Sequence, residues 1–108
     1  MPTNWNNQQT NNLIAALLSL KNQSEAKRFL RDLLTAEELV EFGKRWQTAQ
    51  LLNQKIPYTA ITKTTGLSST TIARIARWLW RGQGGYQLIL NRLSHHAHSP
   101  KQTVSGGF

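Results

Sequence analysis

Apolar residues between residues 12 and 93 recur every three or four positions, which is the spacing of one face of an α-helix. The first apolar stretch covers residues 13–20, and the second begins at Ser24 and ends at Leu34. No segment alternates apolar and polar residues as a half-buried strand does. The pattern therefore predicts an all-α chain.

A third and longer helix is predicted to begin at Thr35. Thr35 and Glu38 have the spacing of a capping box, in which each side chain accepts a hydrogen bond from the other residue's backbone N–H. The apolar residues that follow are again three or four apart, and the helix should end near residues 53–55. They are Leu39, Phe42, Trp46, Ala49 and Leu52.

Residues 58–77 have the layout of two short helices joined by a tight turn, a helix-turn-helix. Gly66 falls at the turn, where a positive φ is needed. Pro57 suits the first turn of the leading helix, and Ser68 or Ser69 can cap the second helix. Four apolar residues fall where the two crossed helices must share contacts. They are Ile61, Leu67, Ile72 and Ile75.

The second helix of the motif should end at the glycines of residues 82–85, and a last short helix should cover residues 86–93. Segments 1–11 and 94–108 are polar and are predicted to be disordered tails on one domain, residues 12–93. His95, His96 and His98 could form a metal-binding tract, but no acid or Cys lies near them. No metal site is expected.

Charge separates the two halves of the chain. It has 13 Lys and Arg against 5 Asp and Glu, and all five acids precede Phe42. The remainder carries nine basic residues and no acid, which suits a polyanionic partner such as double-stranded DNA. The chain has no Cys, no apolar run that could span a bilayer and no signal-peptide pattern, so we expect a cytoplasmic protein without a membrane partner.

The motif supplies the candidate DNA contacts. Residues Ser69, Thr70, Ala73 and Arg77 share the helix face turned away from the isoleucines, so they are the candidates for reading bases, although Arg77 could instead hold a phosphate. The full set of predicted DNA-binding residues is Lys55, Tyr58, Thr59, Lys63, Ser68, Ser69, Thr70, Ala73, Arg74, Arg77 and Arg81.

From about Leu13 to Leu93 the chain resembles the Trp repressor superfamily, most closely its YerC/YecD-type branch. The resemblance is carried by LLTAEE at the start of the long helix, TTGLSSTTIARI at the turn and second helix, and GGY after it. It implies an intertwined, all-helical homodimer that presents two helix-turn-helix units to successive major grooves. It also implies a transcriptional regulator, most simply a repressor.

The resemblance further implies an effector pocket. Arg45 and Arg74 stand where the family's repressor holds an indole between two arginines, and Thr71 matches a nearby Thr. Trp78 and Ile75, however, replace small residues near that pocket and reduce its space. We therefore expect no cofactor and no requirement for L-tryptophan. A tryptophan-dependent co-repressor mechanism is the alternative.

DNA binding has two alternatives among the classes of function. An enzyme is not expected, because no set of titratable residues has the spacing of a catalytic site. An RNA-binding or protein-interaction module could use the four Trp to stack on bases. Trp46 and Trp78, however, fall at positions typical of the core, and Trp80 could belong to a dimer surface.

Overall fold

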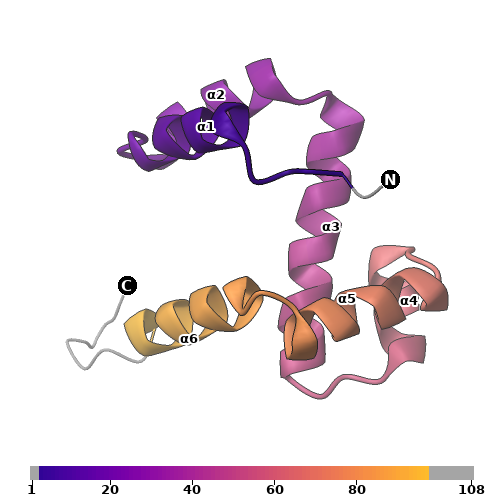
Figure 1. Ribbon diagram of the computed structural model, residues 1–108. Helices are drawn as coiled ribbons and strands as arrows, with labels where there is room; N and C mark the ends of the chain where they lie inside the picture. The colour runs from indigo at the N-terminus through magenta and orange to yellow at the C-terminus, as the bar shows by residue number, and fades with distance from the viewer. Residues whose placement is uncertain (1–2, 98–108) are drawn as a thin grey trace. The chain divides into compact units, whose positions relative to one another are not determined.

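The computed structural model describes residues 3–97, and within that range it contains six α-helices and no strand, which confirms the all-α prediction (Figure 1). The helices are α1 (Gln8–Leu18), α2 (Gln23–Leu33), α3 (Ala36–Asn53), α4 (Tyr58–Thr65), α5 (Ser69–Arg81) and α6 (Gly85–Ala97). The predicted ends of α3 and α5 are confirmed.

The ordered region is longer than predicted at both ends. Helix α1 begins at Gln8, so residues 8–11, assigned above to a disordered tail, are helical. Asn7 caps this helix, since its side chain accepts from the Thr10 N–H at 2.9 Å. Likewise α6 continues through residues 94–97, and only the remainder of the predicted C-terminal tail, residues 98–108, lies outside the described residues.

Side-chain caps fix the starts of α2 and α3. Helix α2 begins one residue before the predicted Ser24, and its capping residue is Asn22, whose side chain accepts from the Glu25 N–H at 2.9 Å. The Thr35–Glu38 capping box of α3 is confirmed. The Glu38 N–H donates to Thr35 Oγ1 at 3.0 Å, and the Thr35 N–H donates to Glu38 Oε1 at 2.9 Å.

The chain divides into two compact units, Met1–Val40 and Glu41–Phe108. The first unit holds α1, α2 and the beginning of α3, and no residue of α1 or α2 is buried. Several large apolar side chains are exposed there, including Ile14, Leu17, Leu18 and Leu33. Helices of this length are marginal in water unless they pack against other elements. The first unit has no such buried surface, so it should not be stable alone.

The second unit contains the hydrophobic core. The predicted contact set of the helix-turn-helix is confirmed, because Ile61, Ile72 and Ile75 are fully buried and Leu67 is nearly so. Helix α5 supplies the largest share of the core and packs against both α4 and α6. The other members of the core are Ala49, Leu52, Ala76, Leu79 and Leu90.

The connection from α3 to α4 holds a lysine in an unusual conformation. The Ile56 N–H donates to the Leu51 carbonyl at 3.1 Å and the Lys55 N–H donates to the Leu52 carbonyl at 3.0 Å, the two bonds of a Schellman motif. Lys55 occupies its left-handed position, with φ 66°. Gly usually takes this position, and a residue with a Cβ costs about 1–2 kcal/mol there.

Two glycines should respond to alanine in opposite directions. Gly66 has φ 77°, so Gly66→Ala should destabilise the fold by about 1–2 kcal/mol through backbone strain alone, since a Cβ would meet nothing within 4 Å. Gly43 lies inside α3 and is equally free of neighbours, so Gly43→Ala should stabilise the fold by about 0.5–1 kcal/mol. Urea unfolding of both variants checks this, and two changes of the same sign would contradict it.

Candidate nucleic-acid interface

The turn between α4 and α5 is held by hydrogen bonds of its own residues. Gly66 ends α4 in the left-handed conformation, and its N–H donates to the Thr62 carbonyl at 2.8 Å. The buried Thr65 hydroxyl donates to the Ile61 carbonyl at 2.8 Å and accepts from the Leu67 N–H at 3.1 Å. These bonds set the angle at which α5 leaves the turn, with the two helices side by side in Figure 1.

Helix α5 has one buried face and one exposed face. Ile72 and Ile75 are fully buried, whereas Ser69, Thr70, Ala73 and Arg77 are all exposed, as their spacing predicted. The first two of these exposed residues lie in the first turn of the helix, and both are short and polar. Short side chains there leave the backbone at the start of α5 accessible to a large partner.

The other predicted contact residues are also exposed, with one restriction. Ser68 is the cap of α5, since it accepts from the Thr71 N–H at 3.2 Å and donates to Thr71 Oγ1 at 3.0 Å. Its hydroxyl is therefore already engaged within the chain. The remaining exposed candidates are Lys55, Tyr58, Thr59, Lys63, Arg74 and Arg81.

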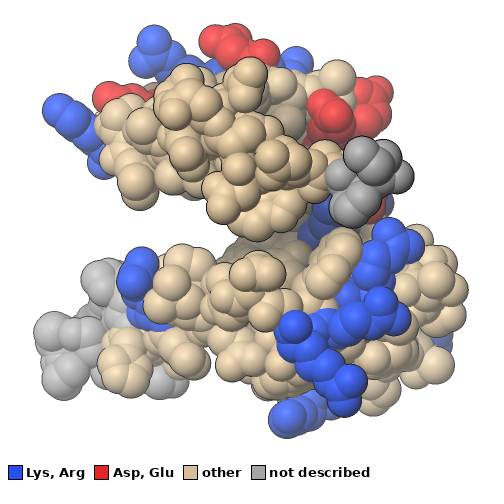
Figure 2. All heavy atoms as spheres, viewed as in Figure 1, with Lys and Arg blue, Asp and Glu red and all other residues tan. Residues whose placement is uncertain are grey.

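The two units differ in charge. The first contains four basic and four acidic residues, whereas the second contains nine basic residues and the single acid Glu41. In Figure 2 the acidic atoms lie over α2 and the first part of α3, and the charged atoms visible over α5 are basic. The helix-turn-helix therefore lies in a unit with a strongly positive field.

The three predicted effector residues have different surroundings in the structure. The Arg45 guanidinium carbon lies 5.3 Å from the centre of the Phe42 ring and 6.0 Å from that of Trp78, so this cation is already covered by the chain's own aromatic rings. Thr71 accepts from the hydroxyl of Ser68. Arg74 lies exposed on α5.

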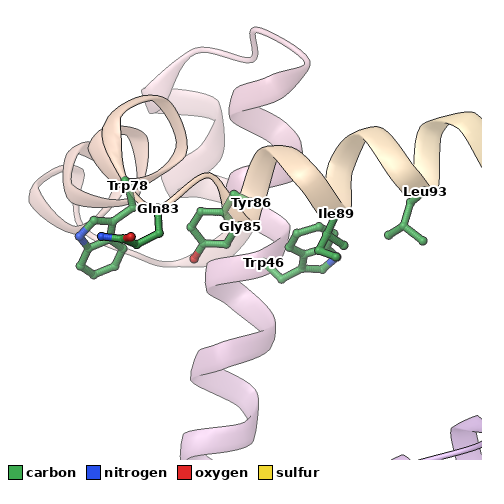
Figure 3. Close-up of a pocket in the computed structure, with 8 residues that line it drawn as sticks. Trp46, Trp78, Gln83, Gly85, Tyr86, Ile89 and Leu93 are labelled. Carbon is green, nitrogen blue, oxygen red and sulfur yellow. The ribbon is translucent and has the colours of Figure 1, made fainter. Parts of the chain in front are cut away.

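An apolar groove of about 890 Å³ lies in the second unit (Figure 3). Trp46 and Tyr86 stack in it, with ring centres 6.2 Å apart. Burial raises the pKa of the Tyr86 phenol, and the charge of Arg45 partly opposes this rise.

The interpretation of Trp78 as a core residue is wrong, because its side chain is 39% exposed. The stripe Ile72, Ile75 and Leu79 fills the core, which leaves Trp78 at the edge of the groove.

The sequence did not single out α6 as part of a site, although it supplies much of the groove. Tyr86, Ile89 and Leu93 line the groove from α6. The Gln87 side chain ties this helix to α5 by donating to the Leu79 carbonyl at 2.7 Å. The spacing of Tyr86, Ile89 and Leu93, three and four apart, is the signal that could have identified this face.

The fold and the exposed face of α5 define an all-α protein with a helix-turn-helix in a basic unit. The family described as Trp repressor protein matches residues 8–94, so the chain belongs to that family. The chain is 36% identical over 81 residues to the uncharacterised protein YerC of Bacillus subtilis, a match that covers 75% of this chain and 78% of YerC.

Solved structures agree with this assignment. A TrpR-like protein from Eubacterium eligens is 34% identical, with a TM-score of 0.80 over 83% of this chain and 93% of that one. A candidate Trp repressor from Staphylococcus aureus is 30% identical, with a TM-score of 0.79 over 86% of this chain and 96% of that one. The family takes its name from a regulator of transcription rather than from an enzyme.

Proposed function

We propose that this protein binds specific double-stranded DNA sequences as a homodimer and regulates transcription, acting as a repressor. The observation that carries the proposal is the exposed face of α5, where short polar residues are followed by arginines in a unit with one acid and nine basic residues. A helix of this kind can lie in the major groove with its first turn against the base edges. We propose the cytoplasm as its location, because a regulator of transcription acts where the DNA is.

A direct competition experiment tests the class of partner. Duplex DNA from a pool of random sequences and single-stranded RNA of equal length compete for the protein at one salt concentration. We expect selection of a family of related duplexes. Preferential capture of the single-stranded RNA would favour the alternative, in which exposed indoles stack on unpaired bases.

The proposed homodimer is supported by apolar surface that one chain leaves open. Helices α1 and α2 bury no residue, and the groove of the second unit is lined by Trp46, Tyr86 and Ile89. Patches of this kind on a small chain indicate an interface between proteins. A second copy would cover them and bring a second helix-turn-helix to the next turn of the same DNA face.

We propose further that L-tryptophan is not required. Arg45 is covered by Phe42 and Trp78, so an indole ligand would have to displace the chain's own rings. Isothermal calorimetry with millimolar L-tryptophan should show no saturable heat, and DNA affinity should be the same with and without it. Saturable heat together with tighter DNA binding would establish the co-repressor mechanism instead.

Thr70 on the exposed face of α5 and Lys63 on α4 should have different roles in DNA binding. Thr70→Ala should change the preferred base sequence while the salt dependence of binding stays the same, because an exposed hydroxyl in the first turn can contact a base edge but carries no charge. Lys63→Ala should weaken binding to all sequences alike. Selections from a random duplex pool check both variants, and the reverse pattern would contradict the assignment.

A further inference from the structure

Trp80 is held in place although it is exposed. It follows the buried Leu79 on α5, and 48% of its surface is accessible. The Lys55 Nζ lies 4.9 Å from the centre of its ring, within the range of a cation–π contact. The lysine is therefore positioned over one face of the indole, and it is the same lysine that occupies the strained left-handed position after α3.

The indole is also one wall of a small hollow on the outer side of α5, which we term the Trp80 hollow. Its volume is about 250 Å³, and its other lining residues are Ala73, Ala76, Arg77 and Arg81. Two alanines leave space, two guanidinium groups supply charge, and the indole N–H is a further donor. No acid follows Glu41 in the sequence, so these arginines have no carboxylate nearby along the chain.

We propose that the Trp80 hollow holds one phosphate group of the DNA backbone in each protomer, a role that rests on the proposed function. Arg77 and Arg81 donate to the phosphate oxygens, the Trp80 N–H adds a neutral donor, and Lys55 fixes the ring. Guanidinium groups suit this task because their planar fork can bind two oxygens at once. Arg77 is thereby assigned to the backbone, and base reading falls to the first turn of α5.

The conformation of Lys55 gives the inference a second, independent support. Glycine would relax the backbone at this left-handed position, so Lys55 makes the fold less stable than glycine would. This destabilising residue is the same one that holds Trp80. Lys55→Gly should therefore raise the melting temperature and at the same time lower the affinity for duplex DNA. A variant that gains stability and keeps full affinity would contradict the role of Lys55.

Three further variants test the hollow against a duplex selected by the wild-type protein. Arg81→Gln should lower affinity about tenfold and reduce the logarithmic salt slope by about 1.8 per dimer, since each lost phosphate contact removes about 0.9. Trp80→Phe should lower affinity severalfold with an unchanged slope, because it removes a neutral donor and keeps the ring. The control Arg92→Gln makes the same charge change on the exposed surface of α6 and should bind as wild type.

Neutral methylphosphonates placed at one backbone position at a time identify the phosphate itself. The wild-type protein should lose affinity when the methylphosphonate replaces the phosphate that the hollow holds. Arg81→Gln has already lost this contact, so the same replacement should lower its affinity little further. If wild type binds the duplex and both Arg81→Gln and Trp80→Phe match it, the hollow is not a phosphate site, although the proposed function stands.

A measurement without DNA tests the Trp80 hollow as an anion site separately from the proposed DNA-binding function. Inorganic phosphate is titrated into ¹⁵N-labelled protein, and the indole N–H resonance of Trp80 is assigned by its loss in Trp80→Phe. A saturable shift that Arg81→Gln abolishes supports the hollow as an anion site even if no duplex is bound. Failure of wild type to bind any duplex, together with no such shift, overturns both proposals.

Discussion

Raising the salt concentration from about 50 to about 200 mM should lower the affinity for duplex DNA about 10³-fold. The estimate takes about six neutralised phosphates per dimer, three on each protomer, and a logarithmic slope of about −5. On each protomer one phosphate lies in the Trp80 hollow, and the exposed Lys63 and Arg74 neutralise one each. Fluorescence anisotropy with a labelled duplex at several salt concentrations measures the slope directly.

The combined variant Lys63→Ala with Arg81→Gln provides the matched comparison. It removes four charges per dimer, so its slope should be shallower by about 3.6. The control Lys27→Ala removes one cation per chain from α2, in the unit that has no net charge, and should keep the wild-type slope. A salt response that is flat in the wild type would contradict DNA binding through the basic unit.

Dilution should lower the melting temperature, because the proposed homodimer would couple folding to association. Ile89 lines the apolar groove, and one chain alone leaves its side chain partly exposed. Ile89→Asp would place an unpaired carboxylate in the interface and should cost about 3–5 kcal/mol per copy, enough to abolish the dimer. Analytical ultracentrifugation and thermal unfolding at several protein concentrations measure both effects.

Thr59→Asp introduces the same charge on the exposed surface of α4 and is the control for stability and association. It should sediment and melt as wild type does. Wild-type protein that sediments as a stable, folded monomer at micromolar concentration, with a melting temperature independent of concentration, would overturn the dimer.

Local signals in the sequence predicted the fold well. The Thr35–Glu38 capping box and the turn at Gly66 each depend on a few neighbouring residues, and both are confirmed. Helices α1 and α2 both begin before their predicted starts, for one reason. Asn7 and Asn22 are as good as Ser or Thr at capping, but the polar residues around them carry no apolar periodicity that would predict a helix start.

Features that depend on packing between distant segments were not predictable. The groove brings together Trp46, Trp78 and Tyr86 from three helices, and the periodicity of each helix gives only its own apolar face. For the same reason Trp78 was assigned to the core. The left-handed Lys55 could not be foreseen, because lysine carries no preference for that conformation.

The lack of a buried residue in α1 and α2 has a consequence for the order of events during synthesis. These helices leave the ribosome before α3–α6, yet they have no core of their own around which to become protected. The backbone amides of α1 and α2 should therefore be the last to gain protection from hydrogen exchange. Until they do, the N-terminal third of each new chain is a substrate for chaperones and proteases.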